Sequence, residues 1–257
     1  MRQLLIVLST ILFFCACNTP EYRINGTIEG VADGDTVELG YSNDGMDFIV
    51  TERSVIKDGK FAFHGKQDGC KIFYIKYDYR VDDTDVTPLY AMFFLEPGNI
   101  NAEFTTESYR ITGTATNDIN TAIEDSLQSY FAQIMTYQEA LLQDSTMSEK
   151  QKAELENKSY MAMYDATTYT KSVVEKNIEN MAGLFFLVRF IDIFDNSELS
   201  RLMAEVPEEN KDADNNPLFE ILYEVSQERN YSGAPDDYEM QELELEMNNM
   251  INDETVE

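Results

Sequence analysis

The sequence predicts an α+β protein, in which an N-terminal antiparallel β-sandwich or barrel is followed by an all-helical segment. Two changes of pattern along the 257 residues support this prediction. Apolar residues alternate with polar ones over residues 22–115, which is typical of strands with one buried face. Over residues 116–231 they recur every three or four positions, which is typical of amphipathic helices. The last region, 232–257, is acidic and poor in apolar residues, so a short helix and disorder are both open for it.

Seven or eight short segments of the region 22–115 are predicted to be strands, and such a series favours a sandwich or barrel. Asp33-Gly34-Asp35 is expected to turn the chain between the first two. Asp58-Gly59 predicts a tight type I′ hairpin, because both residues tolerate positive φ angles. The two most apolar segments, 72–79 and 89–95, are expected to be central strands. The candidate segments are 22–28, 36–41, 48–56, 60–64, 72–79, 89–95, 100–104 and 109–114.

Two long amphipathic helices are predicted to follow and to pack as an antiparallel hairpin. In the first, Ile119 and Ile123 begin a series of inward residues spaced three or four apart. Asn117 is expected to cap the N-terminus of this helix. Ser148 is expected to open the second helix with a capping box, in which Gln151 is its partner.

Three shorter helices are predicted after the hairpin. Gly183 is expected to interrupt the second long helix, and residues 184–194 are expected to form a largely buried helix. Ser197 is expected to cap a short helix that ends near Pro207. Pro217 suits the first position of the last helix, where a missing amide hydrogen leaves no bond unmade. Tyr and Met recur along the predicted helices, for example at Tyr160, Met161, Met163 and Tyr164. They are interpreted as packing residues, with a ligand groove as the alternative.

Residues 1–16 have the pattern of a signal peptide. Arg2 is the one charged residue before an apolar run at positions 4–14. A helix that spans a bilayer needs about 20 apolar residues, so this run is too short for one. It is therefore expected to be a targeting segment, with a buried apolar helix as the alternative.

Cys17 is predicted to be the lipid-bearing first residue of the mature protein. Ala16 before it is small, as lipoprotein processing requires, and Cys15 is a poorer candidate because the bulky Phe14 precedes it. Residues 17–21 then form the lipidated end and a short linker. Four extended residues reach about 14 Å, so the β domain is expected to lie close to the membrane.

The composition is strongly acidic, with 48 Asp and Glu against 19 Lys and Arg and a net charge of −29. A field of this sign repels nucleic acid and anionic lipid headgroups, so a nucleic-acid partner is not expected. Binding of cations or basic partners is compatible with the charge. Solubility at a crowded surface is the simpler explanation of it.

No catalytic, cofactor-binding or metal-binding residue can be assigned from the sequence. With Cys17 lipidated, Cys70 is the single remaining thiol of the mature chain, so internal dithiol chemistry is excluded. Cys70 is expected to be a small packing residue. His64 has no second histidine and is expected at the surface of a strand. The acidic turns at 33–35 and 82–85 lack the regular spacing of calcium loops and are expected to be solvated.

Five short motifs follow one another in order along the predicted β domain. They are 22–28 (YRINGTI), 33–37 (DGDTV), 56–61 (IKDGKF), 94–100 (FLEPGNI) and 111–118 (ITGTATND). Their joint order resembles the domain of unknown function 4369, DUF4369. The resemblance implies a lipoprotein of the cell envelope of a Gram-negative bacterium, on the periplasmic side or at the outer membrane.

The resemblance also implies a relation to redox proteins. In many proteins of this kind, the domain is followed by helices and then by a thioredoxin-like domain of the thiol-disulfide oxidoreductase or AhpC-TSA type. Residues 232–240 look similar to the lead-in of such a domain, but the sequence holds no Cys-x-x-Cys. This chain is therefore expected to lack the thioredoxin domain. No catalytic residue can be carried over from the resemblance.

The leading hypothesis is a non-catalytic lipoprotein of the envelope that serves as a binding or scaffold module. Its expected partners are the membrane, through the lipid, and an envelope protein. The alternative is an accessory or docking partner of an envelope thiol-disulfide oxidoreductase system. A hydrolase that uses a carboxylate pair is a third hypothesis, because 48 acidic residues offer many pairs and single out none.

Overall fold

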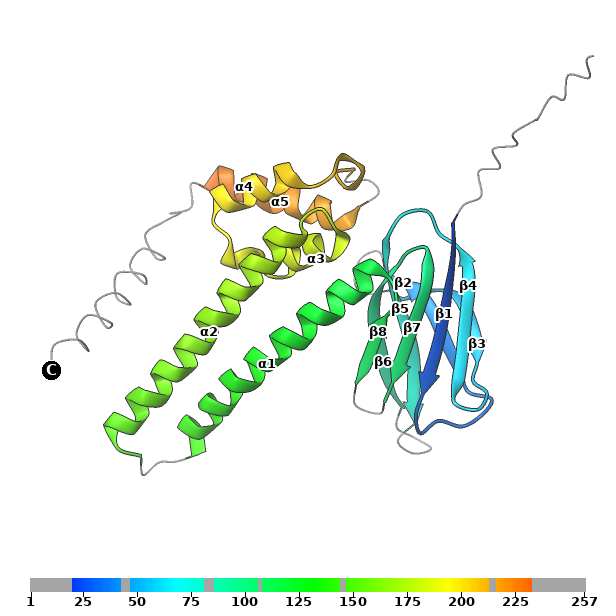
Figure 1. The fold of residues 1–257 in the computed structure, drawn as a ribbon, viewed down its shortest axis with the longest axis horizontal. Helices are drawn as coiled ribbons and strands as arrows, with labels where there is room; N and C mark the ends of the chain where they lie inside the picture. Colours follow the sequence, from blue (N-terminus) through cyan, green and yellow to red (C-terminus); the bar gives the residue numbers. More distant parts are fainter. Residues whose placement is uncertain are drawn as a thin grey trace, which may run out of the picture.

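A computed structural model of the chain describes residues 20–42, 47–80, 86–105, 108–143, 147–212 and 216–232. In this part of the chain, eight strands precede five α-helices and two short 3₁₀ helices (Figure 1). The predicted α+β class, with an N-terminal β part and a helical part after it, is confirmed. The predicted signal peptide at 1–16, the lipid site Cys17 and residues 233–257 of the tail lie outside the described residues.

The eight strands form two four-stranded sheets that enclose an apolar core between them. Sheet A has the strand order β4-β1-β7-β8, and sheet B has the order β3-β2-β5-β6. Neighbours are antiparallel except β1 and β7, which are parallel. Strict alternation of buried and exposed residues along β1 shows why the period of two predicted this layout. The strands are β1 (Glu21–Ile28), β2 (Thr36–Tyr41), β3 (Ile49–Val55), β4 (Lys60–Lys66), β5 (Lys71–Arg80), β6 (Val86–Leu95), β7 (Gly98–Phe104) and β8 (Tyr109–Thr112).

The predicted Asp58-Gly59 turn is confirmed, but it joins the two sheets. Asp58 and Gly59 have φ angles of 52° and 66°, and Lys57 and Lys60 exchange two backbone hydrogen bonds of 3.0 Å. The strand before the turn, β3, belongs to sheet B, whereas β4 belongs to sheet A. The turn is therefore a corner of the sandwich, where the chain passes from one sheet to the other.

One prediction about strand position is wrong. β5 is central, as expected, but β6 lies at the edge of sheet B. The apolar composition of β6 has a different cause, because its Phe94 is fully buried in a second core that the helices form. An apolar strand can thus be covered by helices as well as by another strand.

The two long helices, α1 (Ala115–Gln143) and α2 (Glu149–Asn177), form the predicted antiparallel hairpin (Figure 1). Each has 29 residues and is about 43 Å long. The Ser148–Gln151 capping box is present in both directions. The shorter elements pack at the end of the hairpin nearest the sandwich and are α3 (Met181–Arg189), η1 (Ile191–Ile193), α4 (Asn196–Glu205), η2 (Glu208–Asn210) and α5 (Pro217–Ser232). None of the described helices is both long and apolar enough to cross a bilayer.

Four predicted details of the helices need correction. Asn117 does not cap α1; it lies inside the first turn and is buried. Gly183 does not interrupt α2, which ends before it, and instead lies buried within α3. The helix expected over 184–194 ends at Arg189 and continues as a 3₁₀ turn. Asp195, in a capping box with Glu198, caps α4 where Ser197 was expected.

Candidate functional site

The first turns of α1 close the open seam between the two sheets. Asn117 accepts a hydrogen bond from the Phe94 amide (2.9 Å) and donates one to the Phe94 carbonyl (2.7 Å). One turn later, the Thr121 hydroxyl donates to the Ile111 carbonyl at 2.6 Å. Phe94 belongs to β6 and Ile111 to β8, the edge strands on this side of the sandwich. Side chains of α1 therefore form hydrogen bonds with edge-strand backbone groups to which a further strand would otherwise bind.

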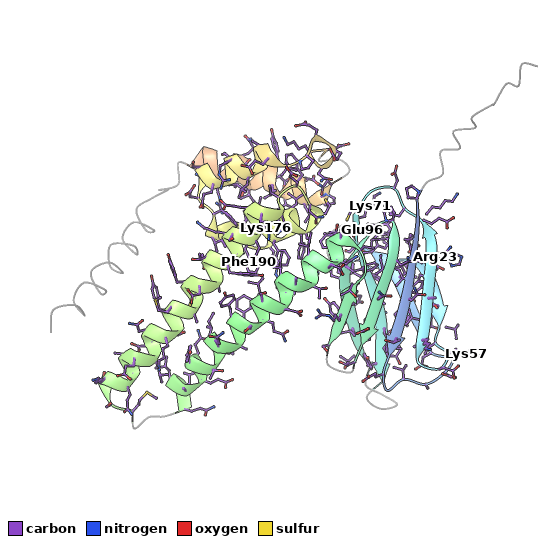
Figure 2. The ribbon with its side chains drawn as sticks, in the orientation of Figure 1. Arg23, Lys57, Lys71, Glu96, Lys176 and Phe190 are labelled. Atoms are coloured by element: carbon purple, nitrogen blue, oxygen red, sulfur yellow. The ribbon has the colours of Figure 1, made fainter. Side chains whose placement is uncertain are left out.

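A glutamate anchors the start of the same helix. The two carboxylate oxygens of Glu96 accept from the amide of Thr116 (2.9 Å) and from its hydroxyl (2.8 Å). Glu96 thus satisfies a backbone donor at the positive end of the α1 dipole. Figure 2 shows Glu96 and Lys71 together at the junction between the sandwich and the helices. This carboxylate is committed to the fold, which makes it a poor catalytic candidate.

Cys70 lies at this junction, partly buried against the helical core. Burial, and to a smaller extent the nearby negative charge of Glu96, raises the pKa of its thiol to about 12. The thiol is therefore protonated at neutral pH, and a protonated thiol is a poor nucleophile. The geometry is consistent with the packing role that the sequence predicts for Cys70.

We expect Cys70 to resist alkylation in the folded protein. At pH 8, iodoacetamide should modify it about a hundredfold more slowly than in urea, where the thiol is exposed and less of it is protonated. Mass spectrometry of the peptide that contains Cys70 measures both rates. Because folding raises this pKa from 9.0 to about 12, the contribution of Cys70 to stability is complete below pH 9 and declines as the pH rises toward 12. Equal alkylation rates in both states would contradict the assignment.

The other residues that the sequence drew attention to are not brought together. His64 is exposed on β4, as expected. Asp33 accepts the amide of Asp58 at 2.7 Å, and Asp35 accepts the hydroxyl of Tyr77 at 2.8 Å. Both carboxylates therefore have structural partners. Over the described ranges, no three His, Cys, Asp or Glu residues gather in a possible metal site, and the predicted solvated loop at 82–85 lies outside them.

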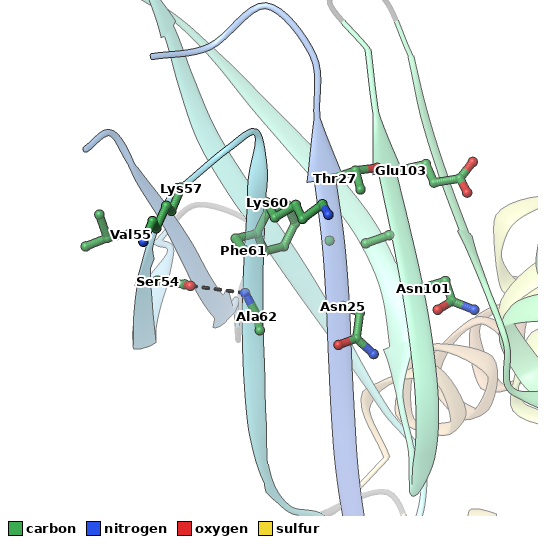
Figure 3. A pocket seen from close by; sticks show the side chains of 12 residues that line it. Asn25, Thr27, Ser54, Val55, Lys57, Lys60, Phe61, Ala62, Asn101 and Glu103 are labelled. Atoms are coloured by element: carbon green, nitrogen blue, oxygen red, sulfur yellow. Dashed lines mark hydrogen bonds between the residues drawn. The ribbon is translucent and has the colours of Figure 1, made fainter. Parts of the chain in front are cut away.

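Two hollows of the described surface lie on the outer face of sheet A. One has a volume of about 650 Å³ and is lined by Lys57, Lys60, Asn25 and Asn101 among others (Figure 3). The second has a volume of about 410 Å³, is lined by Arg23, His64 and Lys66 among others, and shares Asn25 and Ala62 with the first. We call this surface the sheet A face. Its residues are Glu21, Arg23, Asn25, Thr27, Lys57, Lys60, Ala62, His64, Lys66, Asn99, Asn101, Glu103 and Arg110.

Strand register arranges the sheet A face in rows. Ala62, Asn25 and Asn101 lie side by side across three strands and make a short, uncharged row. A row with His64 and Arg23 flanks it on one side, and a row with Lys60 and Glu103 on the other. Such a surface can hold anionic groups with lysine ammonium groups and amide donors. It offers no nucleophile paired with a base.

Sequence reasoning missed the sheet A face. The available signal was that Arg23, Lys60 and Lys66 all occupy exposed positions of alternating strands. Only the pairing of β1 with β4 puts these cations on one surface.

A second exposed surface lies on the helical hairpin. Phe131, Met135 and Leu142 on α1 are exposed, Leu142 to 85%. Their spacings of four and seven residues place them on one stripe of the helix. On α2, Met161, Met163 and Tyr164 are exposed as well. The packing role predicted for Tyr and Met therefore does not extend to Met135, Met161, Met163 and Tyr164, whose side chains are largely exposed in the described structure.

The β part of the chain matches the model of one known family. Residues 22–120 match the family model described as "Domain of unknown function (DUF4369)". The matched range covers the sandwich and the first turn of α1, including Glu96, Thr116 and Asn117. No curated protein and no solved structure matches the chain.

Proposed function

We propose that this protein, whose β-sandwich is a DUF4369 domain, is a non-catalytic lipoprotein of the cell envelope that serves as a binding or scaffold module. The observation that carries the proposal is the exposed apolar surface of the α1–α2 hairpin. On α1, the exposed Phe131, Met135 and Leu142 lie on one stripe, and exposed apolar surface of this kind is typical of protein interaction sites. Met and aromatic residues are enriched in such interfaces because they bury much area and adapt to partners.

The anchor part of the proposal rests on the N-terminal pattern. A short apolar run followed by Ala16 and Cys17 suits a lipoprotein signal peptide. The carbonyl of Pro20 accepts a hydrogen bond from the amide of Gln67 at 3.0 Å, so Pro20 is held beside the end of β4. A lipid on Cys17 would therefore hold the sandwich close to a membrane.

The alternative role beside an envelope thiol-disulfide oxidoreductase has to be non-covalent. A mixed disulfide needs a reactive thiolate, whereas burial keeps the Cys70 thiol protonated by raising its pKa to about 12. Docking through the hairpin would remain compatible with that role. The identity of the bound partner would distinguish a general binding module from an accessory of an oxidoreductase system.

Crosslinking in the producing cell tests the proposal. We expect the double variant Phe131→Glu/Met135→Glu to lose at least about 90% of the crosslinked partner, because two charges would have to be buried in the interface. Tyr223→Glu is the matched control, since Tyr223 is exposed to the same degree as Met135, 53%, but lies on α5. Circular dichroism checks that all variants are folded.

Two results would count against the proposed function. Equal partner yield from the hairpin variant and the control would remove the hairpin as the binding surface. Mass spectrometry of the N-terminal peptide from the same cells would remove the anchor if Cys17 carried no lipid.

A further inference from the structure

We propose that the sheet A face lies against an anionic membrane surface and thereby orients the tethered protein. This inference rests on the proposed function, because it takes Cys17 as the point of attachment. It adds a second membrane contact and assigns it to named residues. The occupant to which the proposal commits is a layer of anionic phospholipid headgroups.

The sheet A face is locally basic, although the chain as a whole is acidic. The sheet A face carries five basic residues, Arg23, Lys57, Lys60, Lys66 and Arg110, and two acidic ones, Glu21 and Glu103. The rest of the chain is acidic enough to give a net charge of −29. The repulsion from anionic lipid that the composition predicts is thus an average over a molecule in which charge is segregated. Near a membrane, such a molecule lowers its energy by turning its basic face inward.

In the described part of the chain, three cations on this face lack an acidic partner. Among the described residues, no carboxylate lies within 4.0 Å of Lys57, Lys60 or Lys66. Sheet B is different, because Arg53 and Lys76 both contact Glu38, at 2.8 and 3.5 Å. Unpaired cations need not break an existing ion pair before they contact a phosphate.

A lipid tether on Cys17 would begin beside the sheet A face. Glu21, the first residue of β1, pairs with Lys66 at the end of β4. The four residues from Cys17 to Glu21 span at most about 14 Å, whereas an eight-residue strand is about 27 Å long. A lipid on Cys17 is therefore attached at the border of the sheet A face. Tethering at this distance raises the effective concentration of headgroups at Lys66 and Arg23.

The side chains of the sheet A face are mostly polar or charged. Ala62 and Val55 are the apolar side chains exposed in the hollows, and neither is large enough to insert deeply. The contact would be electrostatic, with ammonium groups and the amides of Asn25 and Asn101 donating to phosphate oxygens. One lipid chain with a basic patch is a recognised pair of signals for stable membrane association.

The orientation also fits the partner surface. Figure 2 shows Arg23 and Lys57 on the part of the sandwich remote from the helices. A membrane that contacts Arg23 and Lys57 would therefore lie on the part of the sandwich remote from the helices, whereas Arg110 at the other border of the face contacts Asp125 of α1 at 2.8 Å. The two exposed surfaces would then have separate roles, one toward the lipid and one toward a protein.

Lysine labelling on vesicles tests the orientation. The chain that begins at Cys17 is coupled through this thiol to a maleimide lipid and placed on two kinds of vesicle. One kind is phosphatidylcholine alone, and the other is an equal mixture of phosphatidylcholine and phosphatidylglycerol. We expect acetylation of Lys57, Lys60 and Lys66 to be at least about fivefold slower on the anionic vesicles. The exposed lysines of α2, Lys150, Lys152 and Lys158, are the internal reference and should react equally on both.

Charge reversal supplies the matched variants. In Lys60→Glu/Lys66→Glu, the remaining Lys57 should lose its protection on anionic vesicles, whereas it should keep it in Lys150→Glu/Lys152→Glu. Equal acetylation of Lys57, Lys60 and Lys66 on both kinds of vesicle overturns the proposal, whether they react at the unprotected rate on both or are protected to the same extent on both. Protection of the wild-type lysines by soluble polygalacturonate as strong as by the vesicles overturns it in favour of a groove for acidic polymers. The synthetic lipid makes the result independent of cellular lipidation, so an unmodified Cys17 in cells refutes the anchor without deciding this test.

Discussion

Replacing Asn117 with Leu should destabilise the protein by about 3–5 kcal/mol. The side chain is fully buried and makes three hydrogen bonds, to the amide and carbonyl of Phe94 and to the Thr114 hydroxyl. Leu has a similar volume but can make none of them. Each buried backbone group left without a partner costs about 1–3 kcal/mol, and the Phe94 groups lie at a sheet edge with no further strand beside it.

Urea denaturation measures the loss, and hydrogen exchange locates it. The Phe94 amide should exchange faster in Asn117→Leu, because its acceptor is gone. Asn25→Ala is the control, since Asn25 is exposed on the sheet A face and its removal should change the free energy of unfolding by less than about 0.5 kcal/mol. A denaturation midpoint of Asn117→Leu equal to that of Asn25→Ala would show that the seam does not depend on this amide.

Replacing Gly183 with Ala should destabilise the protein by about 3 kcal/mol or more. A Cβ atom at this position would lie 2.0 Å from the carbonyl oxygen of Asn177 and 2.3 Å from its carbonyl carbon. These atoms are backbone at the end of α2, so no side-chain rotation can relieve the overlap. Either α3 moves away from α2 or the helix is strained.

Steric overlap and helix propensity predict opposite changes in stability for Gly183→Ala. Without the overlap, Ala in a helix is about 1 kcal/mol more favourable than Gly, so propensity alone predicts stabilisation. Thr168→Ala, at an exposed position of α2, is the control that should follow propensity and be neutral or slightly stabilising. Thermal denaturation of both variants gives the comparison. A midpoint for Gly183→Ala at or above that of the wild type would refute the close approach of the two helices.

The junction explains two of the motifs that resemble DUF4369. Segments 94–100 and 111–118 are separated in sequence but meet where α1 joins the sandwich. Glu96 holds the first turn of α1, and Asp118 accepts the amide of Gly113 at 2.8 Å. Gly113 has a φ of 100°, and a Cβ there would lie 2.5 Å from the Asn99 carbonyl. Glu96, Gly113 and Asp118 therefore build the connection between strands and helix. Residues of the sheet A face, such as Arg23, Asn25 and Lys60, come from the motifs 22–28 and 56–61.

Much of the local structure could be predicted from the sequence. Alternation identified the strands, Asp58-Gly59 identified a turn with two positive φ angles, and Ser148 with Gln151 identified a capping box. Each of these signals depends on residues a few positions apart, whose conformational preferences act within one element. The prediction that Asn117 caps α1 was wrong, because an Asn side chain can either cap a helix or, when buried, hydrogen-bond a neighbouring strand.

The candidate site was much less predictable. The sequence located Cys70 and His64 and correctly gave them structural or surface positions, but it did not identify the sheet A face. Arg23 and Lys60 are 37 positions apart in sequence, and their strands are neighbours only because the chain changes sheets at Asp58-Gly59. Net charge concealed the same face, since a sum over all residues carries no information on where the charges lie.

By itself, the sequence determined the class of the fold, the positions of most strands and helices, the turn at Asp58-Gly59 and the single thiol left beyond the N-terminal segment, because these depend on local pattern and composition. Only the tertiary structure decided that β6 is an edge strand, that Asn117 closes the seam beside it and that unpaired lysines gather on one face. Those features depend on which distant strands become neighbours and in what register. Pairing of that kind is settled by the burial of the whole core and not by any short segment.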